Sequence, residues 1–260
     1  GRSPINDQNR ELIAELKQEV ADAGWDIPVY WGNRNWHPFL TDTIREMYSA
    51  GVRRVAAVVT SAFGSYSACR QYRDNLVKAL ADAGAAEMTI DKVNHYAPSP
   101  VFADCVAERV KEAAAKLAGG GAAARLIFTA HSIPISMAQA SPYVEQLEAA
   151  SARVAALTGY SDWRLVYQSR SGPPTQPWLE PDVVDHLKEI AQSGVKQVVI
   201  CPIGFLSDHM EVLYDLDTEA AAACQELGIE MARAGTIGTH PRFVRLLRDM
   251  IEAGEVMPAE

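Results

Sequence analysis

Residues 198–219 read VVICPIGFLSDHMEVLYDLDTE, and this stretch decides how the second half of the chain is expected to fold. Its first four residues are apolar and mostly β-branched, which is typical of a strand buried in a parallel sheet. Pro202 and Gly204 end the strand, and Ser207 or Asp208 is predicted to cap the helix that follows. Open α/β sheets place their ligands where a strand, a short loop and a helix N-terminus meet.

Glu211, Asp215 and Glu219 recur at a spacing of four in the predicted helix, and we call them the acidic row. This spacing puts three carboxylates on one helix face, where like charges repel unless a cation lies among them. An ordinary solvated helix face would show the same pattern. The row begins in the first turn beyond the carboxyl end of a strand, and this position favours a cation site. His209 lies near the same strand end and is a further candidate ligand, through a ring nitrogen.

The composition is that of a globular protein without an anionic partner. The 260 residues are 48% hydrophobic, enough for the core of one large domain or two small ones. A formal net charge of −9 argues against nucleic acid or an anionic membrane surface as a partner. No apolar run approaches the ~20 residues that a transmembrane helix needs. We therefore expect a cytoplasmic monomer with no transmembrane segment and with reduced cysteines.

Short apolar segments alternate with helical segments along the whole chain. The predicted strands cover residues 27–31, 54–60 and 87–93, then 124–130, 163–168, 198–201 and 229–232. Strict alternation predicts an α/β fold with parallel sheets flanked by helices. The triple glycine 119–121 is the best candidate for a domain boundary. The expected architecture is two Rossmann-like domains, residues 1–120 and 121–240, that face each other across a cleft, with a terminal helix in 241–260 packing back across them.

His131 directly follows the apolar run 125–130, at the carboxyl edge of the second predicted sheet. A lone histidine there is as often a hydrogen-bonded structural residue as a functional one. Glu211 leaves the same edge of the same sheet, so an imidazole and a carboxylate are expected to face one cleft. This donor pair suits iron, zinc, cobalt or nickel better than magnesium or calcium. Two strong ligands leave the metal open on several sides, which suits a site that passes the metal on.

Three motifs closely resemble those of ferrochelatases. They are TAHSIP at 129–134, YQS at 167–169 followed by PWL at 177–179, and SDHMEVLY at 207–214. Each motif alone is moderately specific, whereas three in order at matching separations are strongly so. The resemblance covers nearly the whole chain and implies two similar domains around a porphyrin cleft, where ferrous iron enters the macrocycle.

The resemblance also implies roles for particular residues. The metal-site histidine and glutamate fall on His131 and Glu211, and the acids of the family's distorted helix fall on the acidic row. Porphyrin contacts fall on Ser3 and Tyr72, and Trp178 is a further candidate for packing on the macrocycle. Family members carry an additional N-terminal segment with a first strand, which this sequence does not include.

Some members of that family bind a [2Fe-2S] cluster through one mid-chain cysteine and three cysteines in a C-terminal tail. Cys69 resembles the first of these, and the given sequence ends at Glu260 without the other three, so a cluster is expected only in a longer parent protein. Cys105, Cys201 and Cys224 are expected to be buried thiols.

Several assignments stay open at this level. Either His131 or Glu211 could remove the pyrrole protons, and the other would bind the incoming metal. A cobalt or nickel chelatase of tetrapyrroles is an alternative in the same class, although such enzymes resemble this pattern less because they tend to carry a second histidine in place of Glu211. A non-catalytic porphyrin or haem carrier is the alternative from another class, but a carrier needs no acidic row.

Coproporphyrin III is a more suitable substrate than protoporphyrin IX, because the chain has no apolar lip for a membrane. No GxGxxG, GxSxG or P-loop motif supports dinucleotide, acyl-transfer or nucleotide chemistry.

Overall fold

A parallel sheet in the second half of the chain carries the candidate site. The computed structural model describes residues 3–65, 71–173 and 175–255. Within them, β3 (Arg125–His131), β4 (Trp163–Gln168), β5 (Gln197–Cys201) and β6 (Glu230–Arg233) form one sheet in the order β4-β3-β5-β6, with every pairing parallel. The predicted α/β fold with parallel sheets is confirmed, and His131 and Gln168 are register partners at one edge.

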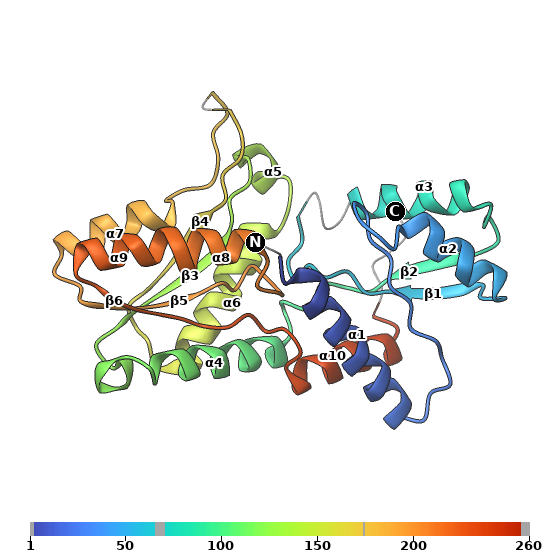
Figure 1. Cartoon of the computed structure of the whole chain (residues 1–260), viewed down its shortest axis with the longest axis horizontal. Coiled ribbons are helices and arrows are strands. Elements are labelled where there is room, and N and C mark those ends of the chain that lie inside the picture. The colour runs from blue at the N-terminus through green and yellow to red at the C-terminus, as the bar shows by residue number, and fades with distance from the viewer. Residues whose placement is uncertain (1–2, 66–70, 174, 256–260) are drawn as a thin grey trace.

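Helices cover both faces of this sheet (Figure 1). Leu126 and Phe128 pack in one core with residues of α4 (Pro100–Ala114) and α6 (Tyr143–Thr158). Ile127 points to the other core, which contains α7 (Val183–Gln192), α8 (Met210–Tyr214), the π-helical segment η3 (Asp215–Ala220) and α9 (Ala221–Leu227). Successive residues of a strand face opposite sides, so continuous apolar strands fit this two-sided burial.

The first half of the chain forms a smaller parallel sheet. It consists of β1 (Arg54–Ala57) and β2 (Thr89–Lys92), with α2 (Leu40–Ser49) and α3 (Tyr72–Ala83) packed together beside it. The strand predicted at 27–31 is wrong: this described segment has no strand assignment, and Ile27 is 50% exposed. A groove of about 420 Å³ separates the segment from β1, so its backbone has no neighbouring strand to pair with.

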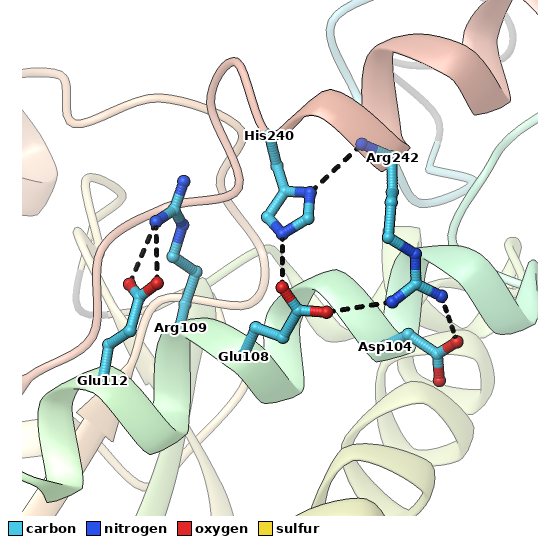
Figure 2. A network of polar contacts seen from close by, with 6 residues as sticks. All are labelled: Asp104, Glu108, Arg109, Glu112, His240 and Arg242. Atoms are coloured by element: carbon cyan, nitrogen blue, oxygen red, sulfur yellow. Dashed lines mark hydrogen bonds and ion pairs between the residues drawn. The ribbon is translucent and has the colours of Figure 1, made fainter.

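Two helices near the chain ends cross between the sheets (Figure 1). These helices, α1 (Ile5–Asp22) and α10 (Pro241–Glu252), pack against each other, and α10 also packs on α4. Figure 2 shows the polar contacts of α10 and the residue before it with α4. His240 Nε2 lies 2.9 Å from Glu108 Oε2, and Arg242 donates to Glu108 at 2.9 Å and to Asp104 at 2.6 Å.

The position of α4 bears on the proposed division into domains. The triple glycine lies in a short 3-10 helix, η2 (Ala118–Gly121), where all three glycines adopt positive φ. Helix α4 precedes it and nevertheless packs on α6 and β5 of the second sheet. The boundary at residues 120/121 stays a prediction. Among the described residues, no helix combines the length and apolar character needed to cross a membrane.

Candidate active site

His131 and Glu211 lie side by side at the carboxyl edge of the second sheet. His131 is the last residue of β3, and Glu211 lies in the first turn of α8, which follows β5 through the loop 202–209. The Nε2 atom of His131 is 3.7 Å from Oε1 of Glu211, and their side chains are 33% and 50% exposed. Parallel topology produces this meeting, because the ends of neighbouring strands share an edge.

Main-chain contacts fix how the His131 ring is presented. Its Nδ1 lies 2.6 Å from the carbonyl oxygen of Ser132, so a neutral imidazole carries its proton on Nδ1 and keeps a lone pair on Nε2, toward Glu211. The hydroxyl of Tyr143 donates to the His131 carbonyl at 3.0 Å. The Glu211 carboxylate raises the pKa of His131 against the opposing effect of burial. In turn, His131 lowers the pKa of Glu211.

His209 supports Glu211 from the other side. Its Nδ1 accepts a hydrogen bond from the Glu211 backbone N–H at 3.2 Å, so His209 is the N-cap of α8. The predicted cap at Ser207 or Asp208 is therefore wrong, because the helix begins at Met210 and only His209 has the right offset. Burial lowers the pKa of His209, and its ring packs edge-on against Phe205.

The other two acids of the row lie in a widened helical turn. Asp215 begins η3 and accepts hydrogen bonds at Oδ2 from Gln168 Nε2 at 3.2 Å and from the Ser169 hydroxyl. Ser169 adopts φ of 59°, a left-handed conformation that turns the chain sharply at the end of β4. Glu219 also lies in η3 and is exposed. Single π turns occur often at functional sites.

Trp178 is held next to the His131 loop by backbone contacts. Leu179 N–H donates to the Ile133 carbonyl at 3.0 Å, and the Ser132 hydroxyl donates to the Leu179 carbonyl at 2.8 Å. Trp178 also forms an isolated bridge with Pro134. Its buried indole N–H has no hydrogen-bond partner. The loop after β4 therefore brings this aromatic ring to the same end of the sheet as His131.

Ser3 and Tyr72 lie in the first half of the chain. Ser3 precedes α1, and its hydroxyl lies 3.4 Å from the backbone N of Ile5. Tyr72 opens α3 beneath the Arg34 guanidinium, 4.8 Å from the ring centroid, and lines the groove beside β1. That groove includes neither His131 nor Glu211 in its lining.

The structure describes three of the four cysteines. Cys69 lies outside the described residues. Cys105, Cys201 and Cys224 are buried free thiols on three different elements, and burial raises the pKa of Cys105 and of Cys224 to about 11 each. Such thiols are poor ligands because metal binding needs the thiolate. Among the described residues, no three His, Cys, Asp or Glu side chains converge into a closed metal cage.

The sequence matches the ferrochelatase family over residues 1–255. The chain belongs to the ferrochelatase family. Ferrochelatases are enzymes whose substrates are a porphyrin and ferrous iron. The chain is 48% identical to the ferrochelatase of Rhodopirellula baltica over 253 residues, which cover 97% of this chain and 72% of that protein. It is 49% identical to the coproporphyrin III ferrochelatase of Streptomyces griseus over 270 residues, covering 96% and 72%.

The fold is also similar to that of a solved chelatase outside the close ferrochelatase relatives. The sirohydrochlorin chelatase SirB from Bacillus subtilis subspecies spizizenii, in complex with cobalt, superposes with a TM-score of 0.62. The match covers 96% of this chain and 89% of SirB at 13% sequence identity. At that identity the likeness concerns the fold alone.

Several residues around the candidate site have no role assigned to them from the sequence. Gln168 and Ser169 served only as part of a motif, although their place at the end of β4 could have indicated contact with the acidic row. Arg233 forms ion pairs with Asp208 and Asp217. No sequence motif predicts these pairs, because Arg233 is distant from both aspartates along the chain.

Proposed function

We propose that this protein inserts ferrous iron into coproporphyrin III, with His131 and Glu211 at the reacting centre. The observation that supports this most directly is the 3.7 Å separation between His131 Nε2 and Glu211 Oε1 at an open edge of the sheet. The names of several relatives of nearly half-identical sequence support coproporphyrin III as the porphyrin.

The reaction exchanges two pyrrole protons for one Fe²⁺ and changes no oxidation state. His131 Nε2 accepts the two protons in turn, since Nδ1 is turned to the Ser132 carbonyl, and passes the first to the acidic row before it takes the second. General-base catalysis of this kind contributes typically ~10²–10⁴-fold. Glu211 stabilises the resulting imidazolium and binds the incoming iron, while Asp215 and Glu219 relay metal inward or protons outward along the helix.

Binding energy would be used to bend the porphyrin. A bent ring tilts the nitrogen lone pairs outward, so that the iron can reach them as it loses water. Trp178 packs on the macrocycle near the His131 loop, and Ser3 and Tyr72 contact it from the first half of the chain. This mechanism assigns no role to Cys69.

The test is anaerobic metallation followed by visible absorption. The protein is mixed with coproporphyrin III or protoporphyrin IX and then with Fe²⁺, Co²⁺ or Ni²⁺. A ferrochelatase accelerates the appearance of the iron porphyrin spectrum above the blank and prefers Fe²⁺ with coproporphyrin III. A carrier only shifts the porphyrin bands, and a preference for Co²⁺ or Ni²⁺ would indicate the other chelatase class.

Variants then test the site. His131→Ala and Glu211→Gln should abolish metallation and leave porphyrin binding largely intact. Glu189→Gln is a matched control, because Glu189 forms a similar pair with His186 at 3.2 Å on α7. Near-normal turnover in His131→Ala would refute the assignment of that residue.

A further inference from the structure

Arg233 connects the last strand of the sheet to the acidic helix. It lies at the end of β6 with its side chain 17% exposed. Its Nε is 2.5 Å from Asp217 Oδ1 and its Nη2 is 3.0 Å from Asp217 Oδ2, a two-point contact with one carboxylate. Its Nη1 is 2.9 Å from Asp208 Oδ1 and 3.1 Å from the Ala234 carbonyl. Paired contacts of this kind fix geometry as well as charge.

The two carboxylates bracket the segment that carries the reacting groups. Asp208 lies in the loop before α8, and Asp217 lies inside η3. Glu211 and Asp215 are between them in the chain. The Asp208 backbone N–H is also bonded to Gln8 Oε1 of α1 at 2.8 Å, so the loop is held from a second direction. Arg233 therefore holds both ends of the segment.

A π turn needs such support, because it departs from the regular helical hydrogen-bond pattern. The acids on this helix repel one another as well, which favours outward movement of the turn. Arg233 directs its donors at Asp208, Asp217 and a carbonyl group, so its one positive charge is shared between these two carboxylates. The acids therefore form two groups. Asp208 and Asp217 anchor the helix, and the acidic row lies on the side of the proposed reaction.

We propose that Arg233 is a positioning residue for Glu211 and Asp215, which it acts on through Asp208 and Asp217. This inference rests on the proposed function, since it assigns a role in iron delivery. The residue touches neither substrate in this scheme. Its contribution is to keep the π turn, and with it the carboxylates, at a fixed distance from His131.

Arg233→Lys is the informative variant, because it keeps the positive charge and loses the two-point contact. Arg125→Lys is the matched control: Arg125 binds Asp162 at 2.7 and 2.6 Å, at the start of β3 and away from the acidic row. Asp217→Asn serves as a second variant that leaves Arg233 in place. Rates are measured against Fe²⁺ concentration and separately against coproporphyrin concentration, and hydrogen–deuterium exchange is followed in peptides spanning 208–217.

Arg233→Lys and Asp217→Asn should lower kcat/KM for Fe²⁺ about 10- to 100-fold and leave the porphyrin KM unchanged. Exchange should accelerate in 208–217 and stay at the wild-type rate in α7, while Arg125→Lys changes neither readout. The proposal is overturned if exchange in 208–217 is unaltered, or if the porphyrin KM changes as much as the iron dependence. An inactive wild-type protein would refute the proposed function instead, and the exchange data would still decide whether Arg233 holds the turn.

Discussion

The side-chain amide of Gln168 lies 3.2 Å from Asp215 Oδ2 and 3.3 Å from the Glu211 carbonyl, so one residue of β4 ties two turns of the acidic helix to the sheet. Gln168 is fully buried and is the register partner of His131. The distance between the imidazole and the acidic row is therefore set by adjacent strand ends. The Oε1 atom of Gln168 has no partner, so the amide is oriented by its donor side alone.

Replacing Gln168 by leucine should destabilise the protein, because Asp215 then keeps only the Ser169 hydroxyl as a side-chain donor. Hydrogen bonds to charged groups contribute about 1.5–3 kcal/mol, and a loss in that range is expected in urea unfolding. Gln197→Leu is the control, since Gln197 also donates to a carboxylate, Glu230, but at an exposed position. Equal losses in both variants would contradict a special role for Gln168.

The titration of His131 should depend on Glu211. In the wild-type protein the carboxylate raises the pKa of His131, so the imidazole stays protonated to higher pH than usual. Glu211→Gln removes this effect, while burial still lowers the pKa and the Ser132 carbonyl and Asp215 still raise it, so the proton is lost at lower pH than in the wild type. Histidine ring resonances followed by NMR across pH 4–9 measure the change.

Glu189→Gln provides the control for that titration. Glu189 counteracts the effect of burial on His186, so its removal should lower the pKa of His186 further and leave His131 unchanged. A His131 titration that is identical in the wild type and in Glu211→Gln would show that the two side chains do not interact in solution.

Gly204 is expected to tolerate no side chain. A Cβ built there would lie 2.7 Å from both Cα and Cβ of Ala130, the residue before His131. Gly204→Ala should therefore push the end of β3 away, with a loss of about 1–3 kcal/mol in unfolding free energy and slower metallation. Gly235→Ala is the control, because the nearest atom is 3.9 Å away. Similar stability of the two variants would contradict this close approach.

The second sheet could be predicted well because its strands are continuous apolar runs buried on both faces. Residues 126–130 and 198–201 are almost entirely apolar, and a parallel sheet then brings the residues that follow them to one edge. This is why His131 and the acidic row were found together from sequence. The α4–α10 contacts, by contrast, involve charged residues that a sequence reader assigns to solvent (Figure 2).

The failures share a physical cause, since each depended on a neighbour that sequence does not reveal. Residues 27–31 have strand-like composition, but a strand needs a pairing partner and the adjacent groove leaves it none. The cap of α8 could not be located because Ser207, Asp208 and His209 all have suitable side chains. Arg233 lies on β6, and only the packing of β6 beside β5 brings it to Asp217.

Gly172 should control the position of Trp178. A Cβ at residue 172 would lie 2.2 Å from Cζ2 of the indole ring, so Gly172→Ala must displace the ring. If Trp178 packs on the macrocycle, the variant should bind coproporphyrin more weakly, while kcat at saturating porphyrin changes little. Porphyrin absorbance titrations give the affinities. In a Trp178→Ala background the same glycine substitution should have no further effect, because both changes act through one ring. Independent, additive losses would mean that the loop, and not the indole, contacts the porphyrin.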